Sequence, residues 1–110
     1  MKTTNKVEIN GFVGMVPEVK TLKNGSKMAR FSIATDEVYK NNAGEWIKNT
    51  TWHPVVVWNK IAEKAGSMLN KGSKVAILGK LRSRSYTDNT GIVRNITEII
   101  AFQLEPDFAA

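Results

Sequence analysis

The chain has 110 residues, the size of one compact domain, and its 42% apolar and 24% charged content is ordinary for a globular protein. The absence of cysteine excludes a disulfide scaffold, a thiolate metal site and a cysteine nucleophile. No apolar run is long enough to span a bilayer, and the N-terminal residues become polar at once. We therefore expect a cytoplasmic protein with no membrane segment and no export signal.

Positive charge is concentrated in one part of the sequence. Sixteen Lys and Arg residues stand against ten Asp and Glu residues, a net charge of +6, and no acidic residue occurs between Lys64 and Thr87. A local surplus of this kind indicates a surface that binds polyanions, and nucleic acid is the commonest such partner of a small basic domain. A solvated basic face is the alternative.

Alternating apolar residues predict strands over the first half of the chain. Residues 6–16 alternate as a half-buried strand, which residues 17–22 continue after a kink, and Asn24-Gly25 is typical of a hairpin turn. A second strand is expected over roughly 28–36, with Phe31 on the core side and Arg30 on the other. The polar residues 40–49 then predict a long hairpin loop, before a third strand at about 50–58.

The pattern changes at Asn59, an expected N-cap, where apolar residues begin to recur at helical spacing until Asn70-Lys71-Gly72 ends the helix. Strands are expected from about residue 74 and over 93–104, joined by a turn at 88–91. The order β-β-β-α-β-β is typical of an all-β, five-stranded Greek-key OB-fold barrel with one helix between strands three and four. Residues 1–110 are predicted to form this single domain.

Alternation along two strands separates a candidate binding face from the core. Five residues share one side of the strand that begins near residue 74, and the last four are cations and an aromatic: Leu78, Lys80, Arg82, Arg84 and Tyr86. Trp52 and Trp58 share one side of the third strand. Rings beside cations suit a single nucleic-acid strand, because bases stack on the rings while Lys and Arg follow the phosphates. Burial in the core or in a subunit contact is the alternative for the rings.

Several fragments, in their order and spacing, resemble the bacterial single-stranded DNA-binding proteins, the SSB family. They include Pro17-Glu18-Val19-Lys20, Phe31-Ser32-Ile33-Ala34-Thr35, Gly44-Glu45-Trp46, Trp52-His53, Trp58-Asn59-Lys60, Lys71-Gly72-Ser73 and Gly79-Lys80-Leu81-Arg82-Ser83-Arg84. The resemblance covers nearly the whole chain. It implies a homotetramer that coats single-stranded DNA without strong sequence preference during replication, recombination and repair, with no cofactor and no metal.

Carried over position by position, the resemblance also implies roles for individual residues. The base-stacking positions are Tyr39, Trp52, Trp58 and Tyr86. The phosphate-binding positions are Lys60, Lys80, Arg82 and Arg84, to which Lys6 and Lys71 are added. His53 matches a histidine of the family's subunit interface. A hydrogen bond within its own domain is the alternative for this ring.

The chain departs from the family in two places. Pro54 stands where the family usually has Arg, so one phosphate contact is missing. A proline here also predicts a locally unpaired or bulged strand. The second departure is at residues 105–110, which lack the linker and the acidic, Phe-ended tip with which the family recruits replication and repair enzymes. Two interpretations stay open: the sequence is trimmed from a longer chain, or it is a short member of the family that coats DNA without recruiting partners through a tail.

Other functional classes have less support in the sequence. One His, no Cys and no Gly-rich loop before a Lys leave no familiar catalytic arrangement, so we expect no enzyme activity. An OB-fold module that binds RNA remains an alternative, because stacking and backbone charge do not discriminate against a 2′-hydroxyl. A dimeric replication-restart adaptor, whose basic face mainly holds other proteins together, is the third possibility.

Overall fold

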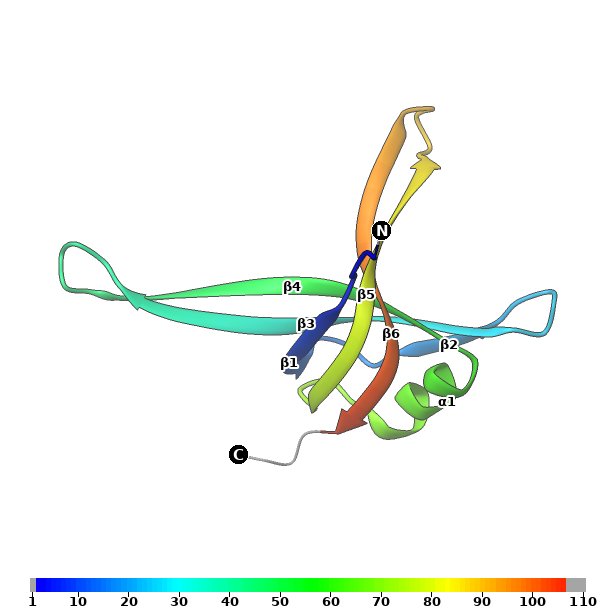
Figure 1. Ribbon diagram of the computed structural model, residues 1–110, viewed down its shortest axis with the longest axis horizontal. Coiled ribbons are helices and arrows are strands. Elements are labelled where there is room, and N and C mark those ends of the chain that lie inside the picture. The colour runs from blue at the N-terminus through cyan, green and yellow to red at the C-terminus, as the bar shows by residue number, and fades with distance from the viewer. Residues whose placement is uncertain (1, 107–110) are drawn as a thin grey trace.

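The structure, a computed structural model, describes residues 2–106. Within that range the chain forms six strands and one helix (Figure 1). In chain order these are β1 (Val7–Val13), β2 (Glu18–Thr21), β3 (Lys27–Lys40), β4 (Trp46–Trp58), α1 (Asn59–Met68), β5 (Lys74–Thr87) and β6 (Val93–Pro106). Residues 107–110, on which the expectation about an acidic tip partly rests, lie outside the described range.

Five of the described strands close into a barrel. β1 pairs with β5, β5 with β6, β6 runs parallel to β4, β4 pairs with β3, and β3 returns to β1. Two of these contacts contain two residue pairs each: Phe12 with Ala34 and Val13 with Ile33 between β1 and β3, and Val55 with Ile99 and Val56 with Ile100 between β4 and β6. The predicted all-β OB-fold barrel is confirmed. Its helix lies between β4 and β5, because β2 is a separate short strand beside β3.

Alternate side chains of the strands fill the barrel with an apolar core. Ile33, Val57 and Val75 are fully buried there. α1 covers one end with the small side chains of Ala62 and Ala65, which are buried as well. Within residues 2–106, no helix has the length and the apolar character needed to cross a membrane.

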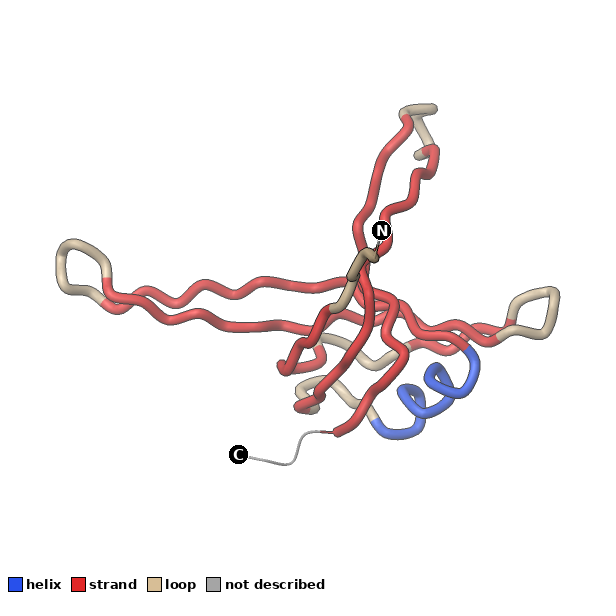
Figure 2. Tube along the Cα trace, in the orientation of Figure 1, coloured by secondary structure: helices blue, strands red, loops and turns tan. Residues whose placement is uncertain are grey.

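Hairpins extend far beyond the barrel from β3 and β4 (the β3–β4 arm) and from β5 and β6 (the β5–β6 arm), and the β2–β3 hairpin projects at the end of the molecule opposite the β3–β4 arm (Figure 2). The molecule therefore measures 55 × 38 × 38 Å, and its radius of gyration of 16.3 Å exceeds the roughly 13 Å of a compact domain this long. The expected loop at 40–49 is wrong, because pairing of β3 with β4 continues to Lys40 and Trp46. Both faces of this arm meet solvent, so its sequence shows no alternation between buried and exposed side chains.

The junction between β4 and α1 also differs from expectation. The N-cap position is held by Trp58, without a side-chain cap hydrogen bond, and Asn59 is the first residue of the helix. Asn59 has φ of 52°, in the left-handed region that Asn tolerates better than most residues. Its Oδ1 accepts the backbone N–H of Lys27 at 3.1 Å, and the Lys27 Nζ donates to Glu63 on α1 at 2.5 Å. Asn59 thus attaches α1 to β3, and the N-cap prediction was wrong.

The bulge expected at Pro54 is absent, since β4 pairs with β3 without a register shift from Trp46 to Trp58. Pro54 lies opposite Ser32, whose carbonyl accepts the N–H of Gly14 on the β1 side. In an antiparallel pair, a residue whose backbone groups point away from its partner belongs to a non-hydrogen-bonded pair. β3 therefore needs no donor from Pro54, and the strand passes through the proline undisturbed.

Candidate nucleic-acid interface

The outward side chains of four barrel strands lie in register across one face. Arg30 of β3 is opposite Val56 of β4, Val56 is beside Ile100 of β6, and Ile100 is opposite Lys80 of β5. Val56 is only 1% exposed. The row thus has a covered apolar centre and a cation at each end. Strands distant in sequence therefore form one curved outer surface with positive charge on both sides.

Beside this row, Glu98 of β6 gathers two of the predicted phosphate-binding residues. Arg82 Nη2 and Arg84 Nε both donate to Glu98 Oε1, at 2.8 and 2.9 Å. The Glu98 side chain is 2% exposed. Burial alone would raise the pKa of this carboxyl, but the hydrogen bonds and charges of the two arginines outweigh it and hold the pKa below its ordinary value. The basic segment, which has no acidic residue of its own, is therefore paired with a carboxylate from the neighbouring strand β6.

The predicted alternation along β5 agrees with the structure. Arg82 and Arg84 contact the same oxygen of Glu98, and the Arg84 guanidinium lies 5.8 Å from the centre of the Tyr86 ring. Lys80 is exposed on the same side, opposite Ile100. Cations and one ring thus follow one another along the outer side of β5 and into its arm.

The four predicted stacking residues do not form one cluster. Trp52, 56% exposed, and the half-buried Trp58 share the outer side of β4, as expected. Tyr86 is 43% exposed on the β5–β6 arm. Tyr39 lies on the β3–β4 arm, and its register places it on the opposite face of that ribbon from Trp52. A strand that reached all four rings would have to bend around the molecule.

Trp52 owes part of its position to a glycine. A Cβ at Gly14 would meet the Trp52 ring and would lie 3.2 Å from the Ser32 hydroxyl oxygen. The ring therefore crosses β3 and lies against the end of β1, where only hydrogen leaves room for it. This packing fixes the position of one exposed indole on the outer surface.

The remaining predicted cations are exposed but spread over the surface. Asn5 binds both the N–H and the carbonyl of Leu81, at 2.9 and 2.8 Å, which brings Lys6 close to Lys80. Lys60 stands in the first turn of α1, next to Trp58 in sequence. Lys71 lies beyond the other end of the helix, in the loop before β5. Lys6 also lies 3.6 Å from the Glu8 carboxylate, so the charge added beside Lys80 is partly neutralised, and Lys71 stands apart.

His53 forms a contact within its own chain. Its Nε2 lies 2.8 Å from the Thr35 hydroxyl on β3, and the ring is half-buried. This is the hydrogen bond that the sequence left open as the alternative to a subunit contact. One ring nitrogen is engaged in this way, so the interface role of His53 stays a prediction.

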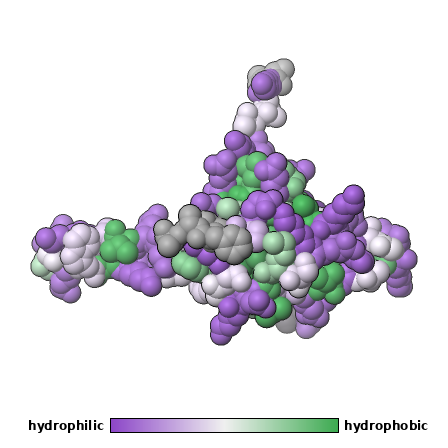
Figure 3. All heavy atoms as spheres, turned by 90° about the horizontal axis from the view of Figure 1, so that it is seen from below, coloured by the Kyte–Doolittle hydropathy of each residue, from purple (hydrophilic) through white to green (hydrophobic). Residues whose placement is uncertain are grey.

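The sequence reasoning left two exposed residues of this surface out of the site. Trp46 is 71% exposed, shares the ribbon face of Trp52, and has the Lys40 Nζ 5.9 Å from its ring centre. Trp46 and Trp52 are an even number of residues apart in the sequence, and this spacing could have placed both rings on one face of the strand. Arg30 ends the row that crosses the barrel, and its alternation with the core residue Phe31 already placed it outside. Figure 3 shows hydrophobic groups over the barrel and also on the β3–β4 arm.

A closed five-stranded barrel whose outer face carries rings and cations defines the class of OB-fold oligonucleotide-binding proteins. The sequence model of the single-strand binding protein family matches residues 4–107 of the chain. The chain therefore belongs to that family. A solved structure of the Plasmodium falciparum SSB in complex with ssDNA is 34% identical, superposes with a TM-score of 0.83, and aligns over 96% of this chain and 94% of that one.

Proposed function

We propose that the chain binds single-stranded DNA without strong sequence preference and without catalysis. The observation that carries the proposal is the outer side of β4, where Trp52 and Trp58 stand beside a register row that ends in Lys80. Phosphate contacts release condensed counterions and supply most of the affinity. The rings select unpaired bases, because paired bases already have both faces covered. Membership of the single-strand binding family supports this function.

We further propose that the protein acts in replication, recombination and repair on cytoplasmic, nucleoid-associated DNA, as a homotetramer. Family membership supports this role. Exposed apolar rings on the barrel, Phe12 at 48% and Phe102 at 50%, are of the kind that subunit contacts cover. Several subunits would also let one strand pass from barrel to barrel, so that rings on different sides of each subunit are used.

Titration of the tryptophan fluorescence tests the function directly. We expect strong quenching by oligo-dT, weak quenching by a matched duplex, and marked loss of affinity between two salt concentrations. Oligo-U serves as the comparison for RNA, and equal binding of oligo-U would favour the RNA-binding alternative. An equal response to duplex, or no response to any strand, would contradict the proposal and favour the adaptor.

Two single substitutions separate stacking from charge. Trp58→Ala is expected to weaken oligo-dT binding by roughly 5- to 150-fold, the effect of about 1–3 kcal/mol per stacked base, with an unchanged salt slope. Arg84→Ala is expected to make the slope of log K against log salt less negative by about 0.7, the value of one phosphate on a single strand. Fluorescence anisotropy of labelled oligo-dT measures both. If both variants change the slope equally, or neither affects binding, this face is not the site.

A further inference from the structure

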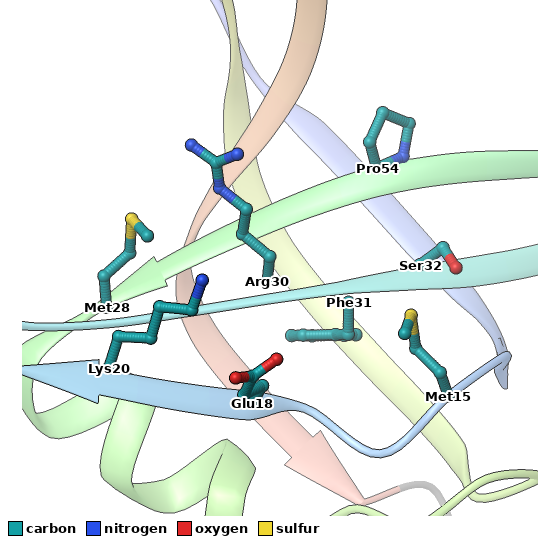
Figure 4. A pocket seen from close by; sticks show the side chains of 8 residues that line it. All are labelled: Met15, Glu18, Lys20, Met28, Arg30, Phe31, Ser32 and Pro54. Carbon is teal, nitrogen blue, oxygen red and sulfur yellow. The ribbon is translucent and has the colours of Figure 1, made fainter.

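Arg30, which ends the row across the barrel, also lines a groove of about 360 Å³ between β2, β3 and β4 (Figure 4). Its lining includes Met15, Glu18, Lys20, Met28, Arg30 and Pro54. The register explains the gathering, since Glu18 is opposite Arg30 and Lys20 is opposite Met28. The walls therefore combine two thioethers and a proline ring with two cations and one acid.

The cations of this groove are less engaged in ion pairs than the arginines of β5. Within residues 2–106, neither Arg30 nor Lys20 forms an ion pair, whereas Arg82 and Arg84 share Glu98. Figure 4 shows the Arg30 guanidinium rising from the side of β3 on which Pro54 lies. Pro54 carries no charge, so Arg30 is the cation of this part of the face. Its planar donors suit a phosphate.

The groove is continuous with the proposed strand-binding surface. Met28 is directly opposite Trp58, and Arg30 belongs to the row that runs through Val56 and Ile100 to Lys80. A nucleotide whose neighbour stacks on Trp58 would therefore find an apolar wall and a cation within the next cross-strand positions. Adjacent nucleotides of a single strand have this alternation of flat base and charged phosphate.

We propose that the groove is a nucleotide subsite in which Arg30, assisted by Lys20, binds a phosphate while Met15, Met28 and Pro54 contact the sugar and base. This inference rests on the proposed binding of single-stranded DNA and adds a part of the path that the rings and β5 do not supply. Glu18 at the rim opposes the phosphate and limits the affinity.

The methionines provide a test in the unmodified protein. The sequence has four, of which Met15 and Met28 line the groove while Met68, 44% exposed on α1, lies outside it. In methyl-labelled protein, oligo-dT is expected to shift the Met15 and Met28 signals and leave Met68 in place. Quenched tryptophans with unshifted Met15 and Met28 would overturn the subsite and leave the proposed function intact. No quenching and no shift would overturn both.

Charge substitutions give a second, independent measurement. Arg30→Gln is expected to weaken oligo-dT binding and to make the salt slope less negative by about 0.7. Glu18→Gln is expected to strengthen binding, a change of opposite sign that damage to the fold would not produce. Lys64→Gln is the matched control, because Lys64 lies on α1 in an ion pair with Glu105. If Arg30→Gln and Lys64→Gln have equal effects, or Glu18→Gln weakens binding, the subsite is refuted.

Discussion

One buried carboxylate limits what two arginines can offer to DNA. Glu98 accepts hydrogen bonds from both Arg82 and Arg84 on a single oxygen, so the three side chains together carry one net positive charge. The sequence could not show this, because Glu98 lies on the strand that follows the basic segment. The pair of arginines is held in place by the same contact that reduces its charge.

The Glu98 cluster predicts a pH dependence of stability. Its pKa is lowered in the folded protein, because the arginine hydrogen bonds outweigh the effect of burial. A carboxyl group with a lowered pKa contributes its full stabilisation at pH values above its unfolded pKa of about 4.3. This contribution to the free energy of unfolding is lost as the pH falls through the pKa of the folded protein. Glu98→Gln is therefore expected to be less stable than the wild type at pH 7 and to lose less on acidification. Urea unfolding between pH 7 and pH 3 measures this.

A second carboxyl provides the control for that experiment. Asp88 organises the β5–β6 turn by accepting hydrogen bonds from Thr90 and Ile92 and an ion pair from Arg94, and its pKa is lowered to about 2. Its contribution is present above about pH 4 and is lost toward pH 2. Asp88→Asn should thus change the lowest part of the curve. If the free energy of unfolding of Glu98→Gln falls with pH as steeply as that of the wild type, Glu98 does not contribute to the pH dependence of stability.

At the scale of elements, the sequence predicted the barrel better than its arms. Inside the barrel every strand has a core side, so alternation located Phe31 and Ile33 and placed Trp52 and Trp58 together. Beyond Thr35 no side chain of β3 is buried, and strand pairing depends on backbone hydrogen bonds that leave no pattern in the sequence. For the same reason, the sequence did not show that Tyr39 lies on the face of the arm opposite to that of Trp52. The side of a strand on which a residue lies could be predicted from the sequence, but the relative placement of side chains on different strands of an arm could not.

The β3–β4 arm can be removed without touching the core. Replacing residues 38–48 with Asn-Gly would close the ladder at the pair Glu37 and Asn49, while every buried residue of β3 and β4 remains. We expect the barrel to fold with nearly wild-type stability and oligo-dT affinity to fall by at least roughly 5-fold, the loss of one stacked base, because Tyr39 and Trp46, on opposite faces of the arm, are both removed. Thermal unfolding and anisotropy measure the two effects. Unchanged affinity would remove the arm from the DNA path.

At the scale of the whole molecule, the arms make a single subunit long, so gel filtration would overstate its mass. Light scattering is expected to give four times the chain's 12.2 kDa. His53→Lys is expected to lower that mass if the ring lies at the subunit interface. Thr35→Val is the control, since it removes only the hydroxyl that contacts His53. Equal masses for wild type and both variants would leave His53 with an internal role alone.

The connection between β4 and β5 has a consequence for the helix that it contains. β6 lies between these two strands in the sheet, so a tight turn cannot join them and the chain must cross the barrel end to reach β5. α1 makes that crossing with ten residues and no side-chain cap, and isolated helices of this length are marginal in water. Its coil-to-helix equilibrium is therefore set by the apolar opening it covers, through Ala62 and Ala65, and a loosened barrel would lose its helix as well.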